Sequence, residues 1–369
     1  MSSRPLPMLS TNPSAINDSM SVELNIKDYS IIQGDCLEVL KTLPEDSVDL
    51  CVTSPPYYGL RSYHAGDREI GQEESPPEYV KSLADVFDEV RRVLKPTGTL
   101  WLNLGDTYNG TKNGNTEVDK NPTLASSQDG LHKKEWKGLP NKSLLGIPWR
   151  VAFALQDRGW ILRNDIIWDR PNSMPDSAPD RVSRAHEYIF MFSKRPSGYF
   201  FDYESIMEDA VGAANEPMTA DNDSPLLIEV EASAQQSYDD LPDDVKAHYK
   251  NLRDEDKGQQ NHSFHKRRAE GKKDVSYQKR RKRDVWRVPS HGFAEAHFAT
   301  YPEKLIEPCV LAGCPKGGLV LDPFNGAATT GVVALKNRRR YLGIELNPEY
   351  IEISHKRIAK ETAQTTFDF

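Results

Sequence analysis

The sequence predicts an α/β protein in which helices cover both faces of one sheet. Two observations support this fold class. Short apolar runs of strand length, such as 50–52 and 319–321, alternate along the chain with segments whose apolar residues recur at helical spacing. The composition is also that of an ordinary globular chain, with 37% hydrophobic and 28% charged residues among 369. Strands that alternate with helices form a largely parallel sheet with helices on both sides.

The first half of the chain alternates strand and helix from residue 29 onward. A short strand at 29–35 ends in a turn, and 36–43 has apolar residues at helical spacing. A second strand at 48–53 ends at Pro55 and Pro56, because proline cannot extend a strand ladder. The other elements expected in this half are a helix at 79–94 ended by a turn at 95–98, a strand at 99–104, a long loop at 109–143, a helix at 147–158, and strands at 160–168 and 187–192.

A charged interval interrupts the alternating pattern between about residues 205 and 285. Hydrophobic density falls there and charge blocks appear, before regular order returns at 285–288. The elements expected after it are a helix at 301–311, a strand at 318–321, a helix at 329–336, a strand at 340–344 and a helix at 348–361. The domain boundaries that follow are a flexible tail at 1–27, ordered parts at 28–204 and 286–361, an insert at 205–285, and a second tail at 362–369.

The net charge of −8 conceals a strong local asymmetry. The stretch 229–256 is mostly acidic, whereas positive residues crowd into the end of the insert. Screening confines the reach of each charge to about 10 Å, so local charge decides contacts with phosphates. The positive residues of this basic cluster are candidates for contact with phosphates, a solvated and mobile charged loop being the alternative; they are Lys266, Arg267, Arg268, Lys279, Arg280, Arg281, Lys282 and Arg283.

Cysteine spacing and hydropathy exclude several classes of protein. The four cysteines, at 36, 51, 309 and 314, fit no paired zinc pattern, and we expect them to be small buried hydrophobes. No apolar run approaches the length of a membrane span, and the first residues lack a secretory pattern. We therefore expect an intracellular protein without a membrane segment or a metal.

The segment that follows the strand at 318–321 carries the first candidate site. The strand ends in Asp322, a turn contains Gly326, and a helix begins near Thr329. Ligands of such sheets bind beyond the carboxyl ends of the strands, and glycine lets the backbone approach them closely. Glu345 ends the next strand, where a carboxylate is suited to both ribose hydroxyls of a nucleoside. These residues favour a nucleoside cofactor over a purely structural turn. Because the Gly-Lys-Ser/Thr ending of a triphosphate-binding loop is absent from this turn, we do not expect ATP.

The run Ser54-Pro55-Pro56-Tyr57 is the second candidate site. The two prolines stiffen the turn and leave carbonyl groups free, since proline has no competing N–H. Rigid acceptors beside an aromatic ring suit a flat heterocycle that carries an NH₂ group. Taken alone, the run is also compatible with a tight proline turn closed by a core tyrosine.

Together the two motifs resemble those of the amino-methylating DNA methyltransferases, in which an (S/N/D)PP(Y/F) catalytic motif accompanies an FxGxG cofactor motif. The catalytic motif comes first here, which resembles the permuted group called beta. The resemblance covers roughly 28–205 and 285–360. It implies a Rossmann-like, S-adenosylmethionine-dependent methyltransferase sheet, with the catalytic part at 28–204, an inserted target-recognition region at 205–285 and the cofactor-binding part at 286–361.

The resemblance also implies a role for each matching residue. Asp35 resembles the residue that binds the adenine amino group of the cofactor, and Glu345 resembles the acid that binds its ribose. One departure is Ala328, where the family usually has a second glycine; alanine adds only a methyl group, so we expect a binding-competent turn. The other implied residues are Ser54, Pro55, Pro56 and Tyr57 for catalysis, Thr53, Lys304, Asp322, Phe324, Gly326, Thr329 and Thr330 for cofactor binding, and Arg61 for DNA.

The expected reaction is transfer of a methyl group from S-adenosylmethionine to an exocyclic amino nitrogen of a flipped DNA base. The sulfonium activates the methyl group, so neither a metal nor an enzyme nucleophile is needed. In the family, SPPY accompanies N4 of cytosine more often, which favours cytosine over N6 of adenine. The Pro308-Cys309 pair lies in the wrong order for a C5-cytosine enzyme.

Other classes and partners remain to be distinguished. A non-catalytic DNA-binding relative, an RNA methyltransferase and a protein-glutamine methyltransferase are the alternatives; intact SPPY argues against the first and the basic insert against the others. The expected partner is double-stranded DNA. A restriction-modification system with a cognate endonuclease is compatible with this class, as are a monomer or a dimer. We expect the protein in the cytoplasm of a prokaryotic cell, associated with the nucleoid. A virus-encoded protein is the alternative.

Overall fold

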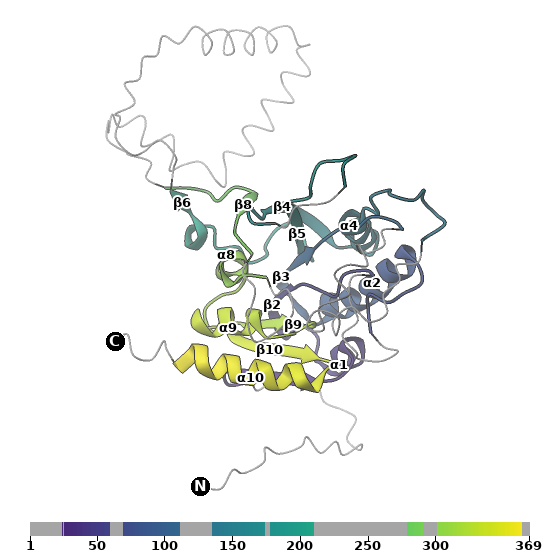
Figure 1. The fold of residues 1–369 in the computed structure, drawn as a ribbon. Coiled ribbons are helices and arrows are strands. Elements are labelled where there is room, and N and C mark those ends of the chain that lie inside the picture. Colours follow the sequence, from purple (N-terminus) through teal and green to yellow (C-terminus); the bar gives the residue numbers. More distant parts are fainter. Residues whose placement is uncertain are drawn as a thin grey trace, which may run out of the picture. The chain divides into compact units, whose positions relative to one another are not determined.

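The fold is taken from a computed structural model, in which the residues described are 24, 26–59, 69–110, 135–173, 178–209, 279–290 and 301–363 (Figure 1). The chain divides into two compact units, one made of 1–206 with 283–369 and the other of 207–282. The predictions for Arg61, Lys266, Arg267 and Arg268, for most of both tails and for most of the loop at 109–143 lie outside the described residues.

A sheet of eight strands in the order β1-β10-β9-β2-β3-β5-β4-β8 forms the centre of the first unit. Among these strands β5 alone runs antiparallel to its neighbours, β3 and β4. The carboxyl ends of the other seven and the amino end of β5 therefore lie at one edge of the sheet. The strands are β1 (Tyr29–Gln33), β2 (Val48–Thr53), β3 (Leu94–Leu104), β4 (Ile161–Asp169), β5 (His186–Ser193), β8 (Val285–Arg287), β9 (Leu319–Asp322) and β10 (Arg340–Glu345).

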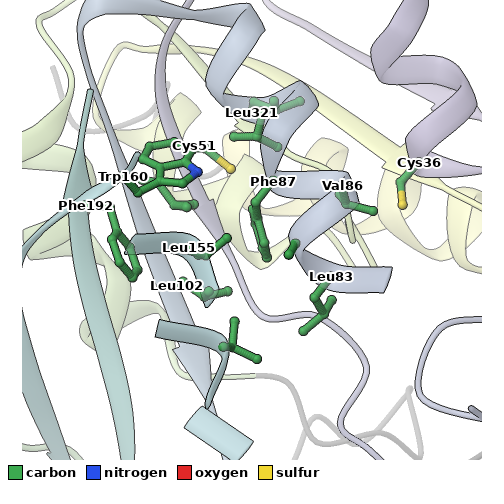
Figure 2. Close-up of a cluster of buried hydrophobic side chains, with 14 of the residues drawn as sticks. Cys36, Cys51, Leu83, Val86, Phe87, Leu102, Leu155, Trp160, Phe192 and Leu321 are labelled. Atoms are coloured by element: carbon green, nitrogen blue, oxygen red, sulfur yellow. The ribbon is translucent and has the colours of Figure 1, made fainter. Parts of the chain in front are cut away.

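Helices cover both faces of this sheet, which confirms the predicted fold class. One apolar core packs under α1, α2 and α4, and includes Phe87, Leu155 and Leu321 (Figure 2). The other packs under α8, α9 and α10. The helices are α1 (Cys36–Thr42), α2 (Pro76–Val93), α4 (Ile147–Asp157), α8 (Glu303–Gly313), α9 (Thr329–Lys336) and α10 (Pro348–Ala363), with a 3₁₀ turn at Glu204–Ile206.

The long helix α2 begins three residues before its predicted start at 79. Ser75 caps it by accepting a hydrogen bond from the N–H of Glu78 at 3.4 Å, and Pro76 occupies the first turn. Proline is tolerated there because the first N–H groups of a helix have no partner within it. The apolar face that identified the helix is fully buried at Leu83 and Phe87, each of which contributes about 1.5–3 kcal/mol.

Strand β3 begins at Leu94, whereas the sequence predicted a turn at 95–98 and a strand from 99. Val48 of β2 pairs with Leu94, but Leu50 already pairs with Thr99. The extra residues bulge out of the ladder, so the predicted turn lies inside the strand. Gly98 permits the bulge, because a Cβ atom there would lie 3.0 Å from the Asp49 carbonyl oxygen.

The second unit is described only at its two ends. β6 (Glu208–Asp209) pairs antiparallel with β7 (Lys279–Arg280). Arg280 Nε lies 2.9 Å from Glu208 Oε1 across this pair. Among the described residues of the whole chain, no helix has the length and apolar character that crossing a membrane requires. No group of ligating side chains that could hold a metal ion is found among them either.

Candidate active site at the carboxyl edge of the sheet

Asp322, the last residue of β9, is a fully buried carboxylate with partners from several parts of the chain. Its Oδ1 accepts hydrogen bonds from Thr53 Oγ1 at 2.6 Å and from the N–H of Phe324 at 3.0 Å. Its Oδ2 accepts from Thr330 Oγ1 at 2.6 Å and from the Tyr301 hydroxyl at 3.3 Å. Burial raises the pKa of Asp322, while the hydrogen bonds from Thr330 and Thr53 act in the opposite direction. Because a carboxylate has about four acceptor positions, these donors engage it fully and join the end of β2 to the turn after β9.

The turn between β9 and α9 leaves space at Gly326 and none at Ala328. Gly326 has a φ of +50°, and a Cβ built on it would meet its nearest neighbour, the Phe324 carbonyl oxygen, only at 4.0 Å. Ala328 has a φ of +56° and is fully buried in the core under α8 and α9. Alanine in place of the glycine that is usual in the family therefore puts a methyl group into the core. Its left-handed backbone conformation costs about 1–2 kcal/mol relative to glycine.

Glu345 ends β10, the strand beside β9. Its Oε2 accepts a hydrogen bond from the N–H of Gly326 at 2.7 Å, and its Oε1 accepts from the N–H of Asn347 at 2.9 Å. Burial raises the pKa of Glu345 to about 7, although these two hydrogen bonds act to lower it. Backbone N–H groups thus occupy part of its roughly four acceptor positions, and the remaining capacity suits ligand hydroxyls.

Asp35 follows β1, the strand on the other side of β10. The N–H of Gly34 donates to the main-chain oxygen of Glu345 at 2.9 Å, so the two strand ends are held together. Asp35 Oδ1 accepts from the N–H of Glu38 at 3.1 Å and caps α1. Three adjacent strands therefore bring Asp35, Glu345 and Asp322 to the edge of the sheet that carries the open turn at Gly326, with Asp35 two residues beyond the end of β1. This arrangement fits a nucleoside-carrying cofactor.

The remaining residues predicted for the cofactor have different surroundings. Thr329 is buried, and its hydroxyl oxygen accepts a hydrogen bond from Arg357 Nη1 of α10 at 2.7 Å. Thr330 is committed to Asp322, as described above. Phe324 is half-buried, and Lys304 is exposed in the first turn of α8. The two threonines thus hold the turn in place, whereas Phe324 and Lys304 keep exposed surface.

The Ser54–Tyr57 turn leaves the sheet directly after Thr53, the last residue of β2. Pro55 is buried. The carbonyl oxygen of Pro56 accepts a hydrogen bond from the Tyr79 hydroxyl of α2 at 2.7 Å. The turn is therefore anchored at one end by Thr53, through Asp322, and further along by α2.

The phenol of Tyr57 is the centre of a polar network. Its hydroxyl lies 2.6 Å from Glu187 Oε2 and 3.0 Å from Asn103 Oδ1, and Ser54 Oγ donates to it at 3.4 Å. Its ring packs on Gly105, where a Cβ atom would come within 2.6 Å of Tyr57 Cε2. Burial, and then the negative charge of Glu187, raise the pKa of Tyr57 well above its usual value. The end of β3, the start of β5 and Ser54 of the same turn thus fix the ring.

Glu187 is a buried carboxylate near the start of β5. Arg170, just after β4, places Nη1 2.7 Å from Glu187 Oε1. Asn103 Nδ2 donates to Glu187 Oε2 at 3.3 Å and to the Tyr188 carbonyl oxygen at 3.1 Å. Sequence reasoning did not place Arg170, Asn103 or Glu187 in the site. A charged residue at the head of an otherwise apolar strand is the signal that could have found Glu187.

The described part of the basic cluster belongs to the second unit and the start of the next segment. Lys279 and Arg280 form β7, and 281–283 follow it. These residues are exposed or half-buried. Their assignment to DNA contact stays a prediction.

Cys309 is fully buried within α8, and its Sγ faces the Leu305 carbonyl oxygen at 3.9 Å. The other three cysteines are also buried and free, as the sequence predicted. A thiol enclosed in this way is not placed to attack a base, which agrees with the exclusion of C5-cytosine chemistry.

A sheet edge that fits a nucleoside-carrying cofactor, beside a rigid proline turn, is the arrangement expected of a nucleoside-cofactor-dependent transferase of α/β fold. The comparison with known families narrows this class. The model of the N6/N4 methyltransferase family, described as DNA methylase, matches residues 48–356. The chain belongs to this family.

Two relatives and one solved structure illustrate the likeness. The type II methyltransferase M.Cfr9I of Citrobacter freundii is 38% identical over 342 residues, which is 92% of this chain and 91% of the relative. The type II methyltransferase M.SmaI of Serratia marcescens is 37% identical over 339 residues, 92% of this chain and 94% of the relative. The PvuII DNA methyltransferase (cytosine-N4-specific) shares the fold, with a TM-score of 0.54 and 20% identity over 92% of this chain and 93% of that one.

Family membership confirms the main expectations from the sequence. The chain is an S-adenosylmethionine-dependent DNA methyltransferase of the amino-methylase family, and DNA is its substrate. The roles of single residues and the identity of the target base are finer questions, and we treat them as proposals.

Proposed function

We propose that this chain methylates the exocyclic N4 amino group of cytosine in double-stranded DNA, as the modification enzyme of a type II restriction-modification system. The observation that carries the proposal is the hydroxyl of Ser54 at the first position of the proline turn, linked through Thr53 to Asp322 and the cofactor turn. The relatives described above are named type II methyltransferases, which supports the biological setting.

Ser54 and Pro55 would hold the amino group. The lone pair of a base amino nitrogen is delocalised into the ring, which makes the nitrogen a poor nucleophile. Hydrogen bonds from its N–H groups to Ser54 Oγ and to the Pro55 carbonyl oxygen favour a pyramidal nitrogen. That geometry is closer to the transition state than to the ground state, so the contacts accelerate the reaction.

The residues at the ends of β1, β10 and β9 would hold the cofactor. In this proposal Asp35 binds the adenine amino group and Glu345 the ribose hydroxyls, while Gly326 and its turn lie against the rest of the molecule. When bound, S-adenosylmethionine supplies a methyl group that its positively charged sulfur has activated. Holding the cofactor and the base in fixed positions supplies much of the rate.

The target cytosine must leave the duplex, because its amino group is not accessible within the base stack. Flipping costs a few kcal/mol. Stacking on the ring of Tyr57 would return about 1–3 kcal/mol of this cost. The hydrogen bond to Glu187 and the packing on Gly105 keep that ring in one orientation before the base arrives.

The proposal is tested with purified protein, S-adenosylmethionine carrying a tritiated methyl group, and bacterial DNA from a strain that lacks DNA methylation. We expect label in the DNA with the wild-type protein, and at least a 100-fold slower incorporation with Ser54→Ala. Thr42→Ala, which removes a threonine hydroxyl near the end of α1, is the matched control and should be as active as wild type. Absence of label with folded wild-type protein would favour a non-catalytic DNA-binding role.

A further inference from the structure

We propose that Glu187 is the positioning residue that receives, through Tyr57 and Ser54, the proton that the base amino group loses on methylation. This inference rests on the proposed function and names a further residue for the same reaction. It follows from the direction in which the hydrogen bonds of the network run, and from the burial of its terminal carboxylate.

The hydrogen bonds from Ser54 to Glu187 run in one direction. The phenol of Tyr57 has one proton and two acceptors near it, Glu187 Oε2 at 2.6 Å and Asn103 Oδ1 at 3.0 Å. The carboxylate is the closer and the charged acceptor, so the phenol donates to it. The Tyr57 oxygen is then free to accept, and Ser54 Oγ donates to it at 3.4 Å.

This direction determines what Ser54 can offer to a base. With its own proton aimed at Tyr57, the Ser54 oxygen presents lone pairs to an incoming N–H group. The serine is therefore set as an acceptor before the base binds, whereas an isolated hydroxyl would rotate freely. An unbroken path of O–H groups leads from the base amino group to the carboxylate.

The surroundings of Glu187 suit a terminal acceptor. It is only 7% exposed, so bulk water does not compete for the proton. Arg170 compensates its negative charge at 2.7 Å, and the amide of Asn103 donates to it at 3.3 Å. Asp106 is another acid near this end of β3, and its side chain is only 4% exposed. Its two oxygens, however, accept from the N–H groups of Gly146 and Ile147 and thereby hold the start of α4.

The proton transfers balance without any further reactant. Methylation leaves the amino nitrogen positively charged, and this makes its remaining N–H groups acidic. One N–H bond breaks as the proton passes to Ser54 Oγ, the original Ser54 proton passes to the Tyr57 oxygen, and the original Tyr57 proton passes to Glu187 Oε2. The products are a neutral methylated amine, a neutral serine, a neutral tyrosine and a carboxylic acid. A proton-transfer group in this position is worth about 10²–10⁴ in rate.

The test compares Glu187→Gln, Tyr57→Phe and the double variant in the full-length protein. Single-turnover rates of tritiated methyl transfer are measured on unmethylated bacterial DNA, and DNA affinity is measured separately by fluorescence anisotropy. Each single variant should lower the rate about 100-fold and change the DNA dissociation constant less than threefold, because the ring of Tyr57 remains. The double variant should be no slower than either single variant, since one path is broken in each. Glu89→Gln, which removes a comparable 2.7 Å ion pair with Arg92 on α2, is the matched control and should keep the wild-type rate.

A wild-type rate for Glu187→Gln, or rate reductions that multiply in the double variant, would overturn the inference. Equal reductions of rate and DNA affinity would also overturn it, because they indicate a merely structural role. A second readout is independent of activity: with 3-fluorotyrosine at position 57, Glu187→Gln should lower the pKa of the phenol as followed by ¹⁹F NMR. If wild-type protein labels no DNA, the proposed function fails. An unchanged phenol pKa in Glu187→Gln refutes the inferred contact whether or not DNA is labelled.

Discussion

The two halves of the functional edge are built in different ways. In the cofactor half, the N–H groups of Phe324 and Asn347, each two residues further along the chain, donate to the carboxylates of Asp322 and Glu345. Glu345 also accepts from the N–H of Gly326, which lies 19 residues earlier. In the catalytic half, Tyr57 depends on Glu187, which is 130 residues further along the chain. Apart from the hydrogen bond from Thr53, the side-chain contacts of Asp322 and Glu345 span at most 21 residues of the chain, whereas the contact of Tyr57 with Glu187 spans 130.

This difference separates what each half contributes. A locally organised half can bind a cofactor that is the same throughout the family. In the proposed function, the half assembled from distant strands would place a serine, a tyrosine and a buried ion pair around a base whose amino group must be held at one angle. Thr53, which donates to Asp322 and precedes Ser54, is the direct link between them.

The largest effect expected in the catalytic half is that of Tyr57→Ala. It removes both the stacking face and the hydroxyl, so methyl transfer should slow more than 100-fold and DNA binding should weaken by about 1–3 kcal/mol. Rates come from tritiated-methyl incorporation and affinities from fluorescence anisotropy. Tyr203→Ala, at an exposed position of the same unit, is the control. Full activity of Tyr57→Ala would show that this half does not act on the base.

Asp322→Asn tests the link between the halves. An amide cannot accept hydrogen bonds from four donors, so buried hydroxyl groups would be left without an acceptor, at about 1–3 kcal/mol for each such group. We expect the free energy of unfolding in urea to fall by about 3 kcal/mol. Asp85→Asn, which weakens the partly exposed ion pairs of this side chain with Lys81 and Arg158, should cost about 1 kcal/mol. Equal destabilisation of the two variants would contradict the structural role of Asp322.

Glu345 should make cofactor binding depend on pH. Burial raises its pKa to about 7. In the proposed role, the ribose hydroxyls would donate to the ionised form. The affinity for S-adenosylmethionine, measured by calorimetry, should therefore rise about tenfold from pH 6 to pH 8, or about 1.4 kcal/mol. The stability of the protein without cofactor should change with pH in the opposite direction. Because the pKa of Glu345 is higher in the folded than in the unfolded protein, its contribution to stability falls as the pH rises from about 4.5 to about 7. Glu345→Gln should abolish both trends, and an unchanged pH dependence in this variant would exclude the role.

The smallest expected effect concerns the basic cluster, which lies outside both halves. Replacing Arg281 and Lys282 by Gln should reduce the slope of log affinity against log salt by about 0.9 for each DNA phosphate that the variant no longer neutralises. The affinity should fall on all DNA sequences alike. Lys41→Gln, at an exposed pair on α1, is the control for removal of a positive charge. If the slope does not change, these residues do not bind phosphates.

The fold and the cofactor half were largely predictable from the sequence. Strand–helix alternation identified the α/β class, and a strand-end acid with a glycine turn identified the region of Asp322 and Gly326. The observed start of a helix differs from the predicted start where a local capping signal was overlooked. Helix α2, for example, begins directly after its cap, Ser75, rather than at residue 79. The three-residue strand β8 was expected only as ordered chain, because so short a segment has no period to recognise.

The catalytic half was predictable only in part. The SPPY run identified Ser54 and Tyr57, because two prolines after a strand leave few structural alternatives. Arg170 and Glu187 could not be connected to them, since their contact depends on β5 running antiparallel between β3 and β4. Nor does the sequence show that Gly105 is required by the ring of Tyr57.

The central claim, methylation of cytosine N4, is tested most directly by mass spectrometry of nucleosides from unmethylated DNA treated with the wild-type protein and S-adenosylmethionine. The account predicts N4-methyldeoxycytidine, and no such product with Ser54→Ala. N6-methyldeoxyadenosine in its place would contradict the assignment of the target base while leaving the family intact.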